Sequence, residues 1–269
     1  GRVQRGSEAD AAWLESCGAE VRRVRCDVSD EAAVLGVVRG WRGDGMRLGG
    51  VFHAAGVRAD ALLANQSAAH FRTVFGPKAN GAQSLHTAAV YAPVATFCVY
   101  SSVASLLGST GQAPHSAANS WLDSLAQWRR GLGQAGLSMQ WGAVAEIGYA
   151  ARHGADAAAE RSGMGAIPRA AAWEALAQVL FTPTRVLAVL PADGGKLLRG
   201  RAEVPGFLAP YQHRAVQQSH ARASAPPVQP AAAGRRPSVG LEAVLALAQR
   251  AAGGAVDADA PLMDAGLDS

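Results

Sequence analysis

The sequence predicts an α/β protein built on a Rossmann-like, doubly wound parallel sheet. Through the first 190 residues, short apolar runs alternate with longer segments of helical periodicity. The short runs are apolar almost throughout, which is typical of strands that are buried on both faces. Alternating strands and helices favour a parallel sheet that is covered by helices on both sides. Apolar residues make up 49% of the 269-residue chain, which is enough for a substantial core.

Five strands and four helices are expected in this alternating part. The predicted strands are Val21–Cys26, Leu48–Ala54, Ala95–Tyr100, Leu137–Trp141 and Arg185–Leu190. The predicted helices lie at about 30–42, 67–90, 115–134 and 168–181, where apolar residues recur at helical spacing. The segment from Gly142 to Pro168 interrupts the alternation with an Ala- and Gly-rich sequence, and we expect it to form a mobile lid.

The sequence changes character after residue 211. Residues 1–211 carry the alternating pattern and are predicted to form one domain. Residues 212–237 are rich in Pro, Ala and Gln without a core-forming pattern, which is typical of a linker. Apolar residues recur at helical spacing again from Val239 onward, so residues 238–269 are predicted to begin a second, helical domain.

Charge and composition exclude several function classes. The net charge is +4, but no basic stripe with interleaved aromatic residues occurs, so we expect no nucleic-acid partner. Three widely spaced cysteines without a CxxC pair suit a reduced, cytoplasmic location. No apolar run approaches the roughly 18 residues of a membrane-spanning helix. The histidines show no metal-ligand spacing, and we expect no metal site.

Four of the predicted strands end in small or polar residues. Ligands of a doubly wound sheet bind beyond the carboxyl ends of its strands, so these ends predict one shared crevice. The expected cofactor-binding residues are Asp27, Val28, Ala54, Ala55, Gly56, Ser101, Trp141 and Gly142.

Lys78, Ser102, His115 and Asn119 form the candidate catalytic constellation. His115 and Asn119 are four residues apart in a predicted helix, so they share one face of it. A hydrolase triad of Ser102, His115 and Asp123 is a weaker alternative, because no GxSxG turn surrounds Ser102.

Three segments around these residues resemble the active site of short-chain dehydrogenase/reductases. They are Tyr100-Ser101-Ser102, Gly111-Gln112, and His115 to Asn119. Within that superfamily they are similar to the ketoreductase domain of a type I polyketide synthase. The stretches 26–28, 51–57, 77–81 and 117–123 resemble the same domain.

The resemblance implies reduction of a carbonyl, which needs a group that stabilises the developing oxyanion and a group that delivers a proton. It also implies a role for each residue of the constellation. Ser102 would hydrogen-bond the substrate carbonyl, Lys78 would hold the ribose of NADPH, and Asn119 would complete a proton relay. The family carries its catalytic tyrosine where this chain has His115. An imidazolium is a competent acid near neutral pH, but the neighbouring lysine cation opposes its charge.

The resemblance also implies a glycine-rich phosphate-binding turn after a first strand. No GxGxxG occurs in this chain. We therefore expect residues 1–211 to be a ketoreductase domain that is N-terminally truncated, lacks the first βαβ unit and holds NADPH weakly.

The last residues, Gly266-Leu267-Asp268-Ser269, resemble the attachment site of an acyl carrier domain. That resemblance implies a 4'-phosphopantetheine group on Ser269 and an incomplete carrier domain at 238–269.

These observations together predict part of a polyketide synthase that reduces a β-ketoacyl thioester to a β-hydroxyacyl thioester with NADPH. The implied partners are an acyl thioester on a carrier domain and the other domains of the same synthase, in a homodimeric parent protein. Three alternatives remain: a silent reductase that serves as a scaffold beside a carrier, the same region of a type I fatty acid synthase, and a free-standing dehydrogenase.

Overall fold

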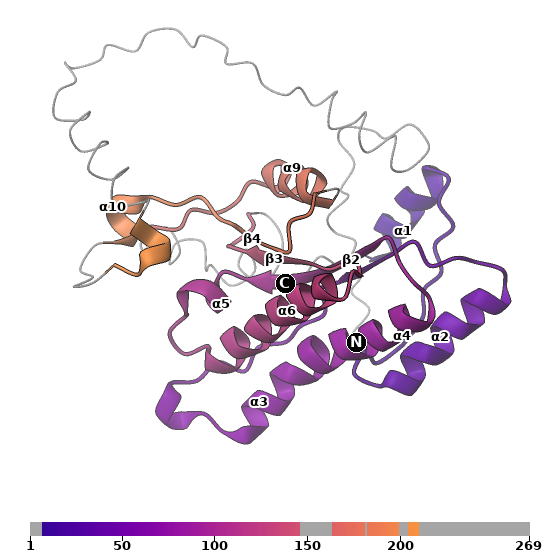
Figure 1. The fold of residues 1–269 in the computed structure, drawn as a ribbon, viewed down its shortest axis with the longest axis horizontal. Helices are drawn as coiled ribbons and strands as arrows, with labels where there is room; N and C mark the ends of the chain where they lie inside the picture. The colour runs from indigo at the N-terminus through magenta and orange to yellow at the C-terminus, as the bar shows by residue number, and fades with distance from the viewer. Residues whose placement is uncertain (1–6, 146–162, 181, 199–203, 210–269) are drawn as a thin grey trace, which may run out of the picture.

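The structure is a computed structural model that describes residues 7–145, 163–180, 182–198 and 204–209 (Figure 1). The predicted linker, the carrier-like end with Ser269 and most of the predicted lid lie outside these residues. The longer helices are α1 (Ser7–Ser16), α2 (Glu31–Gly43), α3 (Ala68–Phe75), α4 (Gly81–Tyr91), α6 (Ala113–Gly131) and α9 (Arg169–Leu180). Short helical turns are η1 (Leu63–Asn65), η2 (Gly76–Asn80), α5 (Ala104–Leu107), α10 (Gly194–Leu197) and η3 (Gly206–Leu208).

The centre of the molecule is one parallel sheet. Its strands are β1 (Gly50–His53), β2 (Thr96–Ser102), β3 (Leu137–Trp141) and β4 (Val186–Val189), in the order β1-β2-β3-β4. Each neighbouring pair is parallel. All four carboxyl ends therefore lie along the same edge of the sheet, where His53, Ser102 and Trp141 end their strands. This Rossmann-like architecture confirms the predicted fold class.

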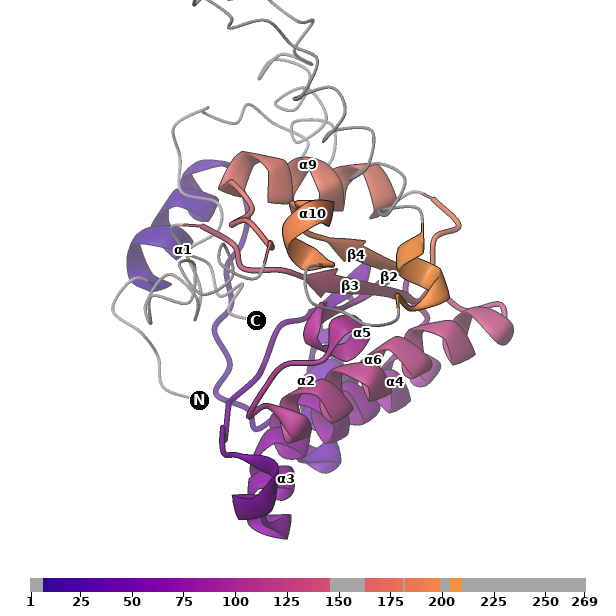
Figure 2. The same ribbon diagram turned by 90° about the vertical axis from the view of Figure 1, so that its left-hand side faces the viewer.

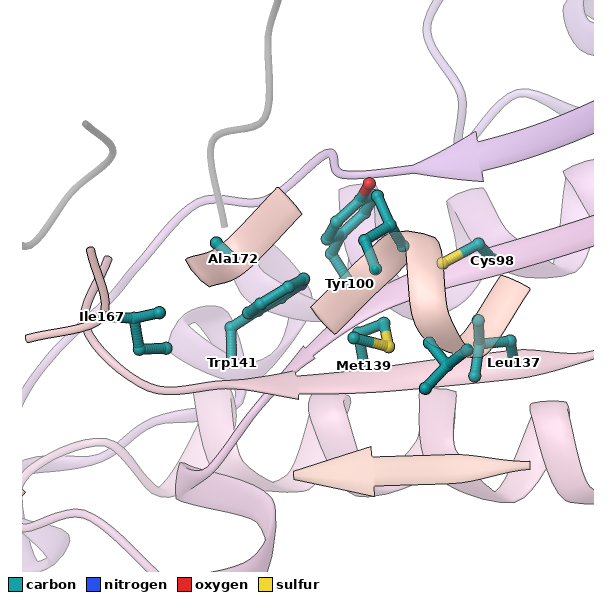
Figure 3. Packing of buried hydrophobic residues seen from close by; sticks show 9 residues of the cluster. Cys98, Tyr100, Leu137, Met139, Trp141, Ile167 and Ala172 are labelled. Carbon is teal, nitrogen blue, oxygen red and sulfur yellow. The ribbon is translucent and has the colours of Figure 1, made fainter. Parts of the chain in front are cut away.

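Successive side chains of β2 and β3 point to opposite faces of the sheet, as the pleat requires. On one face, Cys98, Tyr100, Leu137, Met139 and Trp141 pack under α9, and Figure 3 shows this cluster. On the other face, Phe97 and Val99 pack against α4 and α6. Helices thus cover both faces of the sheet, with α9 on one and α4 and α6 on the other (Figure 2).

A buried arginine fastens α6 beside α4. Arg129 donates from Nε to the Ala135 carbonyl over 2.7 Å and from Nη1 to His86 Nδ1 over 2.6 Å. Its guanidinium carbon lies 3.9 Å from the centre of the Phe97 ring. These contacts hold the C-terminal end of α6 against the sheet, and they thereby orient the other end, which carries His115 and Asn119.

The predicted helix over 67–90 is interrupted. A capping box of Ser67 and His70 begins α3, and a π-helical turn at Gly76–Asn80 separates it from α4. Pro77 lies at the start of this turn and has no N–H to donate, which breaks the regular hydrogen-bond ladder. The interruption carries Lys78, in line with the frequent occurrence of π-turns at functional sites.

The strand predicted at Val21–Cys26 is not formed, and that prediction was wrong. The segment runs through the described part of the chain without pairing to any described strand. It is largely exposed, with Val24 at 50%. A strand is stable only when its backbone groups pair with a neighbour, and an apolar pattern alone cannot supply one.

The flanks of the predicted lid are paired. Val144 bridges Ile167, and Met164 bridges Ala192. None of the helices in the described residues is long and apolar enough to cross a membrane.

Candidate active site

Lys78 is the centre of the candidate site. Its side chain is 1% exposed, and Nζ donates to the Tyr100 carbonyl over 3.1 Å and to Asn119 Oδ1 over 2.9 Å. Burial, with a contribution from the Arg58 cation and against the opposing Asp123 carboxylate, lowers the pKa of Lys78 to about 8. An ammonium group has three hydrogens, so two acceptors among the described residues leave one to bind a ligand.

His53 holds the backbone that carries Lys78. His53 is buried at the end of β1, and its Nε2 lies 2.9 Å from the Lys78 carbonyl oxygen. A carbonyl can only accept, so His53 Nε2 donates, and this sets the tautomer of the ring. Burial lowers the pKa of His53 to about 4, so the ring is neutral near pH 7.

Asn119 connects Lys78 to the helix that carries His115. While its Oδ1 accepts from Lys78, its Nδ2 donates to the His115 carbonyl over 2.8 Å. Ser101 Oγ donates to the Asn119 carbonyl over 3.3 Å, which ties α6 to the end of β2. His115 and Asn119, one helical turn apart on α6, thus lie next to each other and close to Lys78, as their spacing predicts.

His115 is 3% exposed, and neither of its ring nitrogens has a hydrogen-bond partner among the described residues. Burial lowers its pKa to about 3, and the Lys78 and Arg58 cations contribute to the shift. The imidazole is therefore neutral near pH 7. A buried polar group without a partner is costly, and such groups occur where a ligand supplies the missing contact.

Ser102 is the last residue of β2 and is partly exposed. Its Oγ accepts from the Ala104 backbone N–H over 3.2 Å, which leaves the hydroxyl proton available as a donor. Ser102 follows Ser101, whose side chain contacts Asn119. The structure thus brings the four predicted catalytic residues to one end of the sheet.

Glycines allow close packing at the predicted cofactor crevice. A Cβ on Gly56 would lie 3.0 Å from Lys78 Cε, and a Cβ on Gly142 would lie 3.2 Å from Leu190 Cβ. Ala54 packs against the core cluster under α9, and Ala55 is partly buried beside it. These residues lie where β1 and β3 end.

Other predicted cofactor residues are placed differently. Trp141 is buried and stacks on Tyr100 with ring centres 6.1 Å apart, so its ring belongs to the core under α9 (Figure 3). The Asp27 carboxylate is exposed and accepts from Ser29, which lowers its pKa. A Cβ on Gly81 would approach the Val28 side chain to 2.8 Å, so Val28 packs against the start of α4.

The hydrolase alternative does not fit this geometry. Asp123 accepts from Ser138, Gln140 and Ser105, and His115 has no partner in the described residues. A triad needs the acid to orient the imidazole.

Sequence reasoning missed several residues at the site: His53, Arg58, Ser105 and Gln140. The position of His53 directly before Ala54, at a strand end, was an available signal. Ser105 and Gln140 gave none, because only the fold brings α5 and β3 to Asp123. The described residues contain no group of three or more His, Cys, Asp or Glu that could hold a metal ion.

Comparisons with known proteins point to one family. A profile described as the KR domain matches residues 1–146. The chain is 41% identical over 155 residues to the "Hybrid PKS-NRPS synthetase pyvA" of Aspergillus violaceofuscus, covering 58% of this chain and 4% of that protein. It is 39% identical over 155 residues to the "Phenolphthiocerol synthesis polyketide synthase type I Pks15/1" of Mycobacterium marinum, covering 56% and 7%.

Solved structures with the same fold carry related descriptions. An A-type ketoreductase from a modular polyketide synthase superposes with a TM-score of 0.74 at 30% identity, covering 80% of this chain and 45% of that one. The first ketoreductase of the tylosin PKS gives 0.69 at 30% identity, covering 77% and 45%. The chain spans less than half of these structures and less than a tenth of the two synthases. Because the KR profile matches more than half of its residues, this chain belongs to the KR domain family.

Proposed function

We propose that this chain is the ketoreductase part of a polyketide synthase and reduces a β-ketoacyl thioester to a β-hydroxyacyl thioester. The observation that carries the proposal is the hydrogen-bonded series from Lys78 through Asn119 to the helix turn of His115, beside the Ser102 hydroxyl. This set offers a cation, a relay amide and two hydrogen-bond donors at one strand end. The relatives' descriptions as polyketide synthases support the same substrate class.

Ser102 and His115 would act on the carbonyl oxygen. The Ser102 hydroxyl has a free proton to donate, and a neutral imidazole has one N–H. Two such donors stabilise a developing oxyanion. A neutral imidazole can polarise a carbonyl in this way without carrying a positive charge. The buried, unpartnered nitrogens of His115 fit that use. The proton that completes the product hydroxyl would reach it from solvent through the partly exposed Ser102 hydroxyl.

NADPH would supply the hydride when bound, and the residues present suit its nicotinamide-ribose end. Lys78 keeps one ammonium hydrogen for a ribose hydroxyl, and Ala54, Ala55 and Gly56 line the same strand end. Gly56 has no side chain to crowd the Lys78 side chain, since an added Cβ would lie 3.0 Å from Lys78 Cε. A fluorescence titration would measure NADPH binding.

A comparison of three residues at position 115 tests the reaction. The intact synthase that contains this chain is assayed for loss of NADPH with a β-ketoacyl thioester, as wild type, His115→Tyr and His115→Phe. We expect wild type to exceed His115→Phe by at least about tenfold, because Phe has no N–H to hydrogen-bond the developing oxyanion. Ser120→Ala on the exposed face of α6 is the matched control and should match wild type. Failure of all three forms would contradict the reductase proposal.

A silent reductase is the second candidate, and the state of His115 favours it. With a pKa of about 3, almost none of the His115 side chain is in the imidazolium form at neutral pH, so it is a poor general acid. If the rate of NADPH loss is the same in wild type and His115→Phe while His115→Tyr is active, the domain is a catalytically inactive scaffold.

We further propose that Ser269 accepts 4'-phosphopantetheine and that the acyl substrate is tethered to a carrier domain. The Asp268-Ser269 pair supports this assignment. Incubating the full-length protein with a phosphopantetheinyl transferase should add one arm by mass spectrometry, and Ser269→Ala should abolish it. An arm that persists in the variant would contradict the assignment. A cytoplasmic homodimer with the other synthase domains is part of the same proposal.

A further inference from the structure

His53 is the last residue of β1, and the pleat of the strand turns its side chain toward α4. Along β1, Val51 and His53 are buried, whereas Phe52 between them is exposed, as the alternation of side chains in a strand requires. Val51 belongs with Ala82 of α4 to one buried cluster. His53 lies on the same face, and its imidazole is therefore directed to the beginning of α4, where the chain forms the π-helical turn η2.

Gly81 leaves room for this imidazole. A Cβ on Gly81 would lie 3.2 Å from His53 Cε1 and 2.8 Å from Val28 Cγ2. A side chain at this position would crowd both neighbours, so glycine lets the imidazole lie against the first residue of α4. The ring is thereby close enough to the turn to bond its backbone.

His53 supplies the Lys78 carbonyl with a donor from outside the helix. Within η2, the Gly81 N–H is shared between the carbonyls of Gly76 and Lys78. His53 Nε2 adds a donor 2.9 Å from the Lys78 carbonyl oxygen. Lys78 is 1% exposed, and a buried carbonyl that lacks a partner is costly. A side chain that bonds into a helical ladder is also a known cause of a local irregularity, so the His53 bond fits the π-helical geometry of the turn.

The position of this carbonyl matters because the Lys78 side chain is held at its other end as well. Nζ donates to the Tyr100 carbonyl over 3.1 Å and to Asn119 Oδ1 over 2.9 Å. Hydrogen bonds weaken steeply as their geometry departs from the ideal, so a shift of the Lys78 backbone by about 1 Å would disrupt them. The imidazole at the backbone and the two acceptors at Nζ together fix the ammonium group.

We propose that His53 is a positioning residue of this site: its Nε2–H holds the π-helical turn at the Lys78 carbonyl, and the turn places the ammonium group between β2 and α6. The consequence for ketoreduction rests on the proposed function. The effect on Lys78 does not, because the surroundings of a lysine side chain can be measured without cofactor or turnover.

Three substitutions separate the donor from the bulk of the ring. In His53→Gln, the amide nitrogen can lie close to the position of the imidazole Nε2, so the bond to the Lys78 carbonyl can be kept. His53→Leu has no donor. His53→Asn has the same amide on a shorter side chain, which places its donor too far from the carbonyl. Val51→Ala, on the same face of β1, is the matched control, because it removes buried volume without removing a donor to Lys78.

Labelling the full-length chain with ¹³Cε-lysine reports the surroundings of Lys78 directly, because the sequence contains only Lys78 and Lys196. Lys196→Arg identifies which NMR signal belongs to which lysine. We expect the Lys78 signal to move from its wild-type position in His53→Leu and His53→Asn, and to keep that position in His53→Gln and Val51→Ala. The exposed Lys196 should keep its signal in all of these His53 and Val51 variants.

An unmoved Lys78 signal in both His53→Leu and His53→Asn would overturn the assignment. A shift of equal size in Val51→Ala would do the same, as would a His53→Gln signal that moves as far as that of His53→Leu, because the imidazole would then matter only for packing. Thermal melts check folding. Loss of the fold in both His53→Leu and His53→Asn would reduce His53 to a stability residue and would also overturn the assignment.

A kinetic measurement connects the position of Lys78 to ketoreduction. In a synthase with measurable ketoreduction, kcat/KM for NADPH should fall by about tenfold in His53→Leu and stay within about threefold of wild type in His53→Gln. An unchanged kcat/KM in His53→Leu would contradict a positioning role in catalysis. Absent turnover in wild type would count against the reductase proposal, whereas the lysine signals would still decide whether His53 positions Lys78.

Discussion

Lys78 Nζ donates to Asn119 Oδ1 over 2.9 Å, and the other end of the same amide donates to the His115 carbonyl over 2.8 Å. The orientation of the Asn119 amide is therefore determined at both ends, with oxygen toward the cation and nitrogen toward a carbonyl. No other amino acid of this size offers an acceptor and a donor in that arrangement.

Replacing Asn119 should therefore lower kcat by more than any loss of folding stability would explain. In Asn119→Leu, a buried ammonium loses an acceptor and the His115 turn loses a donor, so we expect kcat for ketoreduction to fall by about 100-fold. Steady-state NADPH oxidation measures the change. Ser120→Ala on the neighbouring exposed position should leave kcat unchanged. Equal kcat in Asn119→Leu and wild type would show that the relay is dispensable.

Acid should destabilise this protein through His53 and His115. Their folded pKa values of about 4 and about 3 lie below the ordinary value of 6.5, so between these limits the unfolded state binds protons that the native state does not. The free energy of unfolding thus falls as pH falls through this window, by up to about 1.4 kcal/mol per pH unit for each histidine. His115→Phe should lose less stability than wild type between about pH 7 and pH 5 in urea titrations, by about 2 kcal/mol. Parallel losses in both proteins would contradict the neutral buried state of His115.

Gly136 should tolerate no side chain. A Cβ there would lie 2.5 Å from the Ala126 carbonyl oxygen and 3.1 Å from Arg129 Cβ, at the point where the chain leaves α6 for β3. We expect Gly136→Ala to lower the free energy of unfolding by about 2 kcal/mol or more, because backbone must move to make room. Gly131→Ala is the matched control: it lies in α6 with nothing within 4 Å and should be neutral or stabilising. Thermal melts of the two variants would distinguish them.

Gly56→Ala should affect the site while the fold remains stable. Its Cβ would lie 3.0 Å from Lys78 Cε, the flexible part of a side chain that can shift by a few tenths of an ångström. Displacing the ammonium group should lower kcat/KM by about tenfold with little change in melting temperature. Gly49→Ala, which meets nothing within 4 Å, provides the control. A normal kcat/KM in Gly56→Ala would indicate that Lys78 need not hold its position.

Elements with a strong local pattern were predicted well. β3 matches the predicted Leu137–Trp141, and α6 and α9 begin within two residues of the predicted helices, because apolar period and length identify such elements locally. The failed strand at Val21–Cys26 shows the limit of that reasoning. Its residues favour extended backbone, but pairing depends on a neighbour that no local pattern reports.

The candidate site divides in the same way. The resemblance to ketoreductases named Lys78, Ser102, His115 and Asn119, and the structure places all four at one end of the sheet. The protonation state of His115 and the hydrogen-bond partners of Asp123 could not be predicted, since they depend on burial and on neighbours from β3 and α5.

By itself the sequence predicted the fold class, because periodicity is a local property, and it supplied candidate site residues through their types and their resemblance to a known family. Only the tertiary structure decided that His115 is buried beside two cations. It also decided that Asp123 accepts hydrogen bonds from Ser105 and from Ser138 of β3 and makes none with a histidine in the described residues. The reason is physical: charge and hydrogen-bond capacity take their value from desolvation and from partners, and both are supplied by distant segments that only folding brings near.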